Sequence, residues 1–190
     1  FSKMMTDLEK AKSGDILLLH GCCHNPTGAN LSQKHWIELT KFCLERNIIP
    51  LVDLAYQGFG DGIEEDVVNL QYMASNLPEM CLAVSCSKNF GLYRERVGTS
   101  LIIVSNKKEY KVAEDNLKSL NRLTFSFPPD FGAAVVNLVL AECDSNRIPL
   151  VEKWKSELTD MRSRMLGLRS LLADSLMRNT NSNRFDFVAN

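Results

Sequence analysis

The sequence predicts an α/β fold: a mainly parallel sheet with helices on both faces, followed by one long helix. Short, continuous apolar runs alternate with stretches whose apolar residues recur every three or four positions. That alternation is typical of buried strands joined by covering helices. A single helical pattern then occupies residues 148–177.

The apolar runs give four predicted strands, at residues 16–20, 48–52, 80–85 and 100–104. A helix is predicted between the first two strands, because Ser32 can cap its start and Asn47 can end it. A second helix is predicted over residues 66–75, before the third strand. Strands that alternate with helices through short loops favour a parallel sheet.

The rest of the chain is predicted to be helical. Residues 107–120 and 131–143 form two helices in this interpretation, separated at Pro128 and Pro129, which cannot continue a helix. The pattern at 148–177 corresponds to a helix ~45 Å long at 1.5 Å per residue. A helix longer than a small domain is wide is expected to bridge two lobes. A partner helix of a coiled coil is the alternative.

Composition excludes several classes of protein. The 190 residues include 22 Lys and Arg against 23 Asp and Glu, a net charge of -1, and 45% are hydrophobic. This balance argues against a nucleic-acid protein, which needs a basic surplus. No apolar run approaches the ~20 residues of a membrane span, so we expect a cytoplasmic protein with no membrane partner. Because the chain starts at Phe1 without a leader, we expect a piece of a longer protein and not a secreted precursor.

The cysteines favour reduced thiols over a disulfide framework. They are embedded in apolar runs of a mid-sized chain, a pattern typical of cytosolic proteins. Cys22 and Cys23 lie near His20 and His24, but no second pair at ligand spacing exists, so we predict no metal site. We interpret Cys22, Cys23 and Cys86 as small packing groups.

Unusual polar residues follow the predicted strands. Asn25 follows the first strand, Asp53 and Tyr56 follow the second, and residues 85–88 follow the third. Ligands of parallel α/β sheets bind at the carboxyl ends of the strands. We therefore expect these side chains to lie together on one edge of the sheet.

Lys88 and Asp53 are the most informative members of this group. A lysine directly after a buried strand is a candidate for imine chemistry, which needs a free amine; a solvated surface lysine is the alternative. A carboxylate after an apolar run is costly unless it meets a cation or several donors. The whole set suits a phosphorylated heteroaromatic ring. It comprises Asn25, Asp53, Tyr56, Ser85, Ser87, Lys88 and Arg96.

Three segments resemble the pyridoxal-phosphate motifs of class I aminotransferases, in the aspartate and aromatic aminotransferase branch. They are His-Asn-Pro-Thr-Gly at 24–28, Asp-Leu-Ala-Tyr at 53–56, and the stretch 85–98 that begins Ser-Cys-Ser-Lys-Asn-Phe-Gly. Their order and spacing match the family, and the similarity covers nearly the whole chain. The resemblance implies that residues 1–145 are the later part of the large cofactor-binding domain of fold type I enzymes. Residues 146–190 would be the long interdomain helix and the start of the small domain.

The resemblance also implies roles for the residues. Lys88 would hold pyridoxal 5'-phosphate covalently and carry the proton in catalysis. Asp53 would pair with the pyridine nitrogen, so that the ring accepts electrons. Asn25 and Tyr56 would bond the phenolic oxygen, and Ala55 would pack on the ring. The phosphate would be held by Ser85, Ser87 and Arg96, with a charged fork from the arginine.

Substrate recognition is implied less fully. Arg122 aligns with an arginine that this branch supplies from the neighbouring subunit of a homodimer to bind the distal carboxylate, and Asn25 would also contact substrate. A helix-end arginine facing water is the alternative. Phe127 and the pair 130–131 depart from the usual pattern, and they leave the preference for aspartate or an aromatic amino acid open.

The implied function is transamination between aspartate or an aromatic amino acid and 2-oxoglutarate, by a ping-pong mechanism. A fold-related lyase or decarboxylase that uses the same cofactor is one alternative. A non-catalytic fragment that serves as an interaction module is the other. Family members are about twice as long and carry further phosphate-binding and carboxylate-binding residues, so we expect the isolated segment to be catalytically incomplete.

Overall fold

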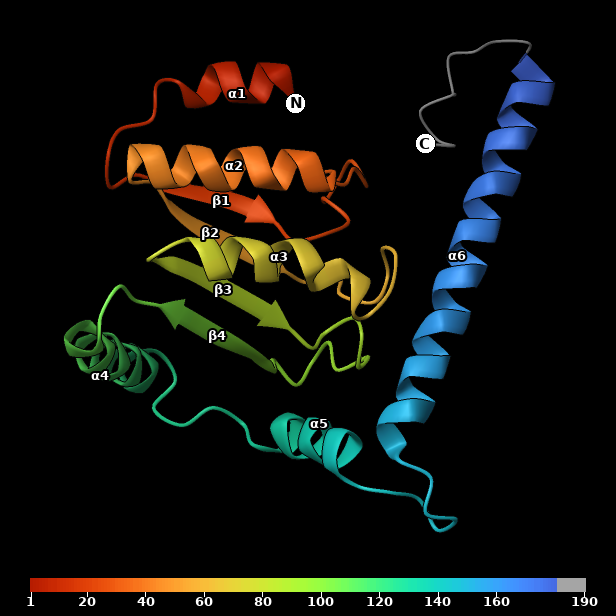
Figure 1. Cartoon of the computed structure of the whole chain (residues 1–190). Helices are drawn as coiled ribbons and strands as arrows, with labels where there is room; N and C mark the ends of the chain where they lie inside the picture. Colours follow the sequence, from red (N-terminus) through yellow and green to blue (C-terminus); the bar gives the residue numbers. More distant parts are fainter. Residues whose placement is uncertain (181–190) are drawn as a thin grey trace.

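A four-stranded sheet in the order β1-β2-β3-β4 lies at the centre of the computed structural model, which describes residues 1–180 (Figure 1). The strands β1 and β2 pair in parallel, as do β2 and β3, whereas β3 and β4 are antiparallel. The α/β class and the mainly parallel sheet are thereby confirmed. The strands are β1 Ile16–His20, β2 Ile49–Leu54, β3 Met80–Ser85 and β4 Gly98–Ile103.

The antiparallel direction of β4 follows from its connection. Residues 86–97 join β3 to β4 without a crossover helix, so the chain returns along its neighbour. The return brings two backbones into close contact at Gly98. A Cβ atom there would lie 2.4 Å from the carbonyl oxygen of Val84, so this position requires glycine.

Helices α2 (Gln33–Arg46) and α3 (Glu65–Asn76) contact each other on one face of the sheet (Figure 1). The Ser32 hydroxyl accepts a hydrogen bond from the His35 backbone N–H, and Asn47 ends α2 in the left-handed conformation at φ 53°. Both predicted ends of this helix are confirmed. A short helix that the sequence analysis did not predict, α1 (Ser2–Leu8), lies outside α2 (Figure 1).

The core lies between the sheet and these two helices. Trp36 and Leu39 of α2, Val52 of β2 and Met73 of α3 are all buried there. Consecutive right-handed crossovers in one direction along the sheet leave their helices on the same face. Over β1 the opposite face stays open among the described residues, where the side chains of Ile16 and Leu18 are 66% and 62% exposed.

The second half of the chain is helical, as predicted. It forms α4 (Lys107–Thr124), α5 (Phe131–Ala141) and the 31-residue α6 (Leu150–Thr180), which runs beside the sheet domain in Figure 1. Within residues 1–180, no helix has both the length and the apolar character to cross a membrane. The division of the chain at residue 146 stays a prediction, and residues 181–190 of the predicted second domain lie outside the described part.

Candidate active site

The loops after β1, β2 and β3 bring three predicted site residues together. The amide nitrogen Nδ2 of Asn25 lies 3.5 Å from the Tyr56 hydroxyl oxygen, to which it donates a hydrogen bond. The ammonium nitrogen of Lys88 lies 4.6 Å from the centroid of the Tyr56 ring. Each strand contributes one member, because the carboxyl ends of parallel strands share one edge.

Asp53 belongs to β2 itself, since the strand continues to Leu54 and does not end at Val52 as the sequence analysis expected. Alternation along the strand buries Val52 and Leu54 against the helices and turns Asp53 to the other face, where it is half-buried. Its carboxylate makes no hydrogen bond or ion pair with any residue in the described range 1–180. Such a group is suited to a cationic ligand. Ala55 is half-buried just beyond the strand.

Local hydrogen bonds fix the loop that carries Asn25. The backbone N–H of Asn25 donates to Nδ1 of His20, at 3.2 Å, and the backbone N–H of Cys23 donates to Oδ1 of Asn30, at 2.6 Å. Nδ1 of His24 lies 2.8 Å from the hydroxyl oxygen of Thr27. The loop is therefore ordered without help from the rest of the site.

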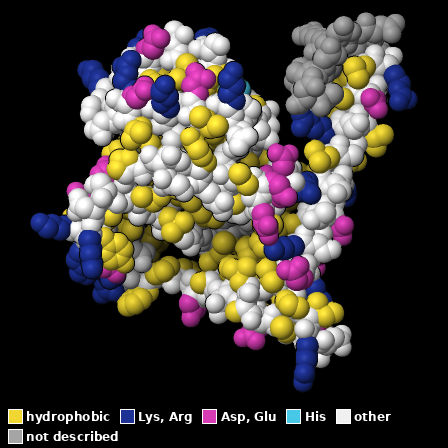
Figure 2. Space-filling model, in the orientation of Figure 1, with side chains coloured by type: hydrophobic (Ala, Val, Ile, Leu, Met, Phe, Trp, Pro, Cys, Tyr) yellow, Lys and Arg dark blue, Asp and Glu magenta, His cyan; other side chains and the backbone are white. Residues whose placement is uncertain are grey.

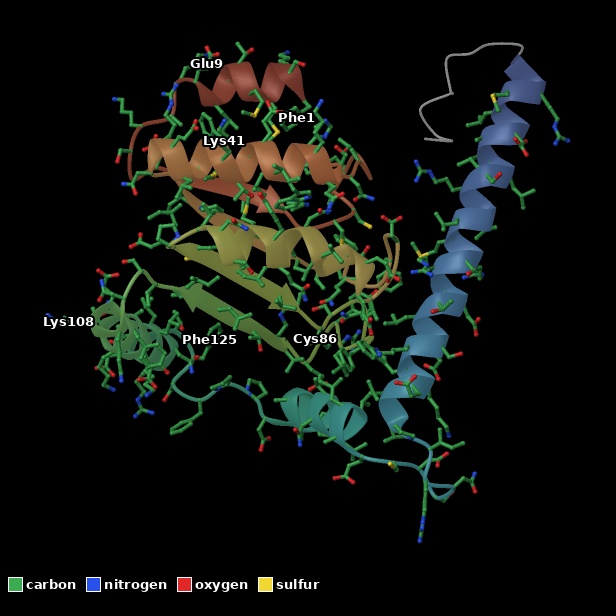
Figure 3. All side chains as sticks on the ribbon, in the orientation of Figure 1. Phe1, Glu9, Lys41, Cys86, Lys108 and Phe125 are labelled. Atoms are coloured by element: carbon green, nitrogen blue, oxygen red, sulfur yellow. The ribbon has the colours of Figure 1, made fainter. Side chains whose placement is uncertain are left out.

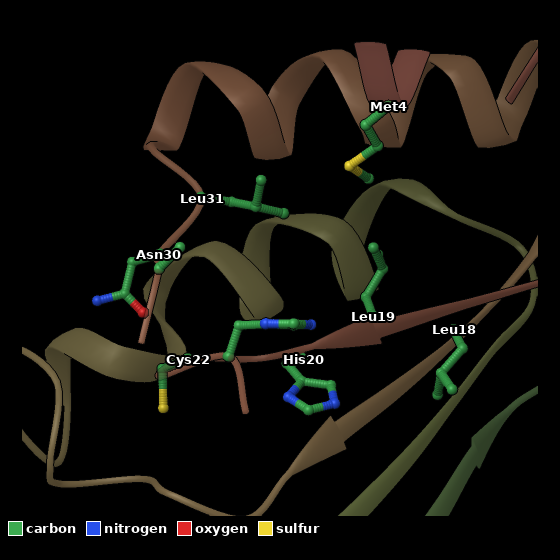
Figure 4. Close-up of a pocket in the computed structure, with 9 residues that line it drawn as sticks. Met4, Leu18, Leu19, His20, Cys22, Asn30 and Leu31 are labelled. Atoms are coloured by element: carbon green, nitrogen blue, oxygen red, sulfur yellow. The ribbon is translucent and has the colours of Figure 1, made fainter. Parts of the chain in front are cut away.

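A cavity of about 290 Å³ lies on the other side of this loop, between α1 and β1 (Figure 4). Met4, Leu19 and Leu31 give it a largely apolar wall, and His20 and Cys22 also line it. The side chains of Asn25, Tyr56 and Lys88 do not line this cavity. The cavity is thus a neighbour of the candidate site and not a part of it.

The proposed anion-binding residues lie around the start of the β3–β4 connection, where Figure 3 labels Cys86. Ser85 ends β3, and its hydroxyl accepts a hydrogen bond from the backbone N–H of the buried Ser87, at 3.2 Å. Arg96 is exposed and lies two residues before Gly98, which pairs with Ser85 at the end of β3. Its guanidinium donates to the carbonyl oxygen of Tyr93, at 3.0 Å.

Arg122 is not part of this cluster within the described chain. The residue lies in the last turn of α4, which extends beyond its predicted end at residue 120. Its guanidinium donates to the hydroxyl of Ser126, at 3.1 Å, and its carbon atom Cζ lies 5.1 Å from the centroid of the Phe127 ring. Phe127 itself is 81% exposed.

The sequence analysis assigned no role in the site to Asp66, which organises the loop after Tyr56. Asp66 is only 8% exposed, and its carboxylate accepts four backbone hydrogen bonds. The donors are Gly58, Gly60, Asp61 and Gly62. The sequence signal for this role was a glycine-rich loop that precedes an acidic first helical turn, because a carboxylate there can accept hydrogen bonds from the loop amides.

A second unassigned residue, Trp154, contacts the segment that follows Lys88. The indole nitrogen of Trp154 donates to the carbonyl oxygen of Asn89, at 2.7 Å. The Trp154 ring stacks on Phe90 with centroids 4.4 Å apart. Trp154 lies within the helix predicted over residues 148–177, and a contact across 65 residues gives no local signal.

The packing role of Cys22, Cys23 and Cys86 stays a prediction. A hydrogen bond with Cys23 and then burial raise the pKa of the Cys22 thiol, and burial raises the pKa of Cys86. All six cysteines are free thiols. Among residues 1–180, no group of three or more His, Cys, Asp and Glu side chains is arranged to hold a metal ion.

Comparison with known proteins places these features in a family. The profile of aminotransferase class I and II matches residues 1–189. The chain is 48% identical over 189 residues to an aromatic-amino-acid aminotransferase of Paracoccus denitrificans, which covers 100% of this chain and 47% of that protein. It is 38% identical over 188 residues to the aspartate aminotransferase of Escherichia coli K12, covering 99% of this chain and 46% of that protein.

Solved structures give the same result. An aromatic-amino-acid aminotransferase from Burkholderia pseudomallei, described as covalently bound to pyridoxal phosphate, superposes with a TM-score of 0.91 at 36% identity. The match covers 99% of this chain and 46% of that one. The chain therefore spans about half the length of the relatives that it matches. From the family profile, the sequence identity and the shared fold together, this chain belongs to the class I and II aminotransferases.

Proposed function

We propose that the protein is a pyridoxal-phosphate-dependent aminotransferase that moves an amino group between aspartate or an aromatic amino acid and 2-oxoglutarate by a ping-pong route. One observation carries the proposal. The Lys88 amine lies over the Tyr56 ring, and the Tyr56 hydroxyl accepts a hydrogen bond from the Asn25 amide. The half-buried Asp53 lies near the end of β2, three residues before Tyr56. The relatives are named as aromatic or aspartate enzymes, so both substrate classes remain in the proposal.

The donors and acceptors present fit this cofactor. The Asp53 carboxylate suits a protonated pyridine nitrogen, and the amide and phenol at Asn25 and Tyr56 suit a ring oxygen. Hydroxyl groups and the Arg96 guanidinium suit a phosphate, because the guanidinium fork matches phosphate oxygens. When bound, pyridoxal phosphate supplies an electron sink for the carbanion that forms at the substrate's α-carbon.

The chain's own residues would then hold and move protons. Lys88 would bind the cofactor covalently and, once the substrate amine displaces it, carry the proton at the α-carbon. A Lys–aromatic contact of this kind contributes only about 0.5–1 kcal/mol, so the Tyr56 ring orients the amine without trapping it. Asp53 would retain the proton on the pyridine nitrogen throughout.

A homodimer in the cytoplasm is part of the proposal. Exposed apolar side chains lie close to Arg122 along the chain; they are Leu120, Leu123, Phe125, Phe127 and Phe131. Figure 2 shows hydrophobic side chains gathered over the part of the molecule near α5. Burying this surface against a second copy would carry Arg122 to the neighbouring site, where it would bind the distal carboxylate of a dicarboxylic substrate.

Reductive trapping tests the proposal. The full-length protein is incubated with pyridoxal phosphate, treated with borohydride and digested, and the labelled lysine is identified by mass spectrometry. The label is expected on Lys88 alone and is lost in Lys88→Ala. A matched control is Lys41→Ala, since Lys41 lies on the outer side of α2 (Figure 3). Labelling scattered over surface lysines contradicts the proposal.

Asp53→Asn tests the charge at β2. Each pKa unit by which the carboxylate stabilises the protonated ring nitrogen is worth ~1.4 kcal/mol, or about tenfold in rate. The half-reaction with glutamate, followed by the absorbance of the bound cofactor, is expected to slow by about a hundredfold or more. A normal rate in Asp53→Asn would mean that Asp53 has another role. If the wild-type protein is labelled at Lys88 but takes no amino group from glutamate, the result would indicate a lyase or decarboxylase.

A further inference from the structure

The turn that carries Lys88 is contacted by a residue far along the chain. The Trp154 indole N–H donates to the carbonyl oxygen of Asn89, and the Trp154 ring stacks on Phe90 with an interplanar angle of 17°. Asn89 is 6% exposed and directly follows Lys88. Trp154 thus holds the two residues after the lysine by two different kinds of contact.

The turn has little support of its own. Inside it the backbone N–H of Phe90 reaches the carbonyl oxygen of Cys86 only at 3.4 Å, and that of Gly91 reaches the carbonyl oxygen of Lys88 at 3.1 Å. A single turn with two internal hydrogen bonds, one of them long, does not fix its own backbone, since helix nucleation is unfavourable. External contacts must therefore determine where the Lys88 backbone lies.

Trp154 is fixed independently of that turn, because the first half of α6 is anchored on the loop after Tyr56. The Lys155 ammonium lies 3.2 Å from the Glu64 carboxylate. Leu158 is 2% exposed, and Arg162 donates to the carbonyl oxygen of Asp61. This loop is itself held by the four hydrogen bonds to the Asp66 carboxylate. α6 is consequently a fixed support that reaches both segments of the candidate site.

We propose that Trp154 is a positioning residue for Lys88, which sets the lysine amine against the Tyr56 ring by holding Asn89 and Phe90. The proposal rests on the proposed function of Lys88. The hydrogen bond fixes the height of the turn above the sheet edge, and the stacked rings prevent it from rotating. Without them the amine samples positions away from the reacting carbon, and a displacement of about 1 Å is enough to slow such a reaction strongly.

Two substitutions separate the two contacts. Trp154→Phe keeps a ring that can stack on Phe90 and removes the hydrogen-bond donor, and Trp154→Ala removes both. Trp36→Phe is the matched control, because it makes the same exchange at a buried position of α2, outside α6 and the lysine turn. Chemical unfolding of all variants measures the general loss of stability, which is expected to be larger for Trp36→Phe than for Trp154→Phe.

Hydrogen exchange of the apo protein gives a readout that needs no cofactor. In the peptide that covers residues 86–91, exchange is expected to accelerate about tenfold in Trp154→Phe and by a larger factor in Trp154→Ala, with no change in β1 or α2. In Trp36→Phe this peptide is expected to exchange within about twofold of wild type, under the same conditions. Unchanged exchange of the turn in both Trp154 variants overturns the proposal.

The half-reaction with glutamate completes the test. Its maximal rate is expected to fall about tenfold in Trp154→Phe, with the substrate concentration at half-maximal rate unchanged, while Trp36→Phe keeps the wild-type rate. Faster exchange with an unchanged rate overturns the positioning role. If the wild-type protein takes no label at Lys88, the proposed function and the role built on it both fail. In that case the exchange data show separately whether Trp154 holds the turn.

Discussion

Replacing Asp66 by asparagine removes the charge that organises the loop after Tyr56 and keeps the shape of the side chain. In the structure Oδ2 accepts from the backbone N–H groups of Gly58 and Gly60, at 2.8 and 3.1 Å. Oδ1 accepts from those of Asp61 and Gly62, at 2.7 and 3.4 Å. An asparagine has one oxygen and one NH2 group, so two of these four donors lose their acceptor.

The size of the effect follows from burial. Asp66 is 8% exposed, so water cannot replace the lost acceptor. Each buried donor left unpaired costs about 1–3 kcal/mol, and the two remaining bonds lose the assistance of a charge. Asp66→Asn is therefore expected to lower the free energy of unfolding by about 2–5 kcal/mol.

Urea unfolding monitored by circular dichroism measures this loss. Asp61→Asn is the matched control: it removes a neighbouring carboxylate but retains the backbone N–H that donates to Asp66, so its stability is expected to change by less than about 0.5 kcal/mol. The amides that donate to Asp66 lie in residues 58–62, so Asp66→Asn is expected to accelerate their hydrogen exchange before that of other segments. A loss below about 0.5 kcal/mol for Asp66→Asn would refute the argument.

Further outcomes are expected at other positions. Gly98→Ala would press its Cβ on the Val84 carbonyl oxygen and lower the free energy of unfolding by about 1–3 kcal/mol. Gly167→Ala, in the middle of α6 with open space around it, would raise the free energy of unfolding by about 0.5–1 kcal/mol. Urea titration of both variants tests this contrast. Burial raises the pKa of Cys43 to about 11 and leaves this residue only 1% exposed, so its native-state alkylation by iodoacetamide at pH 8 is expected to be at least about tenfold slower than in a urea-denatured control; equal rates argue against this. Arg122→Ala is expected to raise the KM for dicarboxylic substrates about 10–100-fold and leave that for aromatic substrates unchanged; equal effects on both would point to a different role.

Local patterns predicted much of the fold. Ser32 and Asn47 marked the ends of α2 because a cap and a left-handed residue act within one helical turn. The boundaries failed where no local signal exists: β2 continues through Asp53 because β1 and β3 pair with it there, and α4 continues past residue 120 because no breaker occurs before Ser126. Propensity alone does not register such pairing.

In the candidate site, the residues that follow the strands were predictable from the sequence, but the residues that support them were not. The side chains that follow parallel strands were expected together because the topology forces their strand ends onto one edge, and the structure places Asn25, Tyr56 and Lys88 there. The supports of the site were not expected. Trp154 reaches Asn89 across 65 residues, and that contact depends on how α6 docks, which no local pattern encodes.

The strand order of the sheet, which equals the order along the chain, has a kinetic consequence. Each strand joins the edge left by the one before it. The paired residues are 33 positions apart in β1 and β2, 30 apart in β2 and β3, and 13 to 23 apart in β3 and β4. Loop closure of this length has a similar entropic cost at each step, so the sheet can grow strand by strand as the chain leaves the ribosome. Lys88 follows the third strand, so its amine reaches Tyr56 only after β1, β2 and β3 have been synthesised. Of Asn25, Tyr56 and Lys88, the lysine is thus the last to be synthesised, when the strands that carry the other two can already have paired.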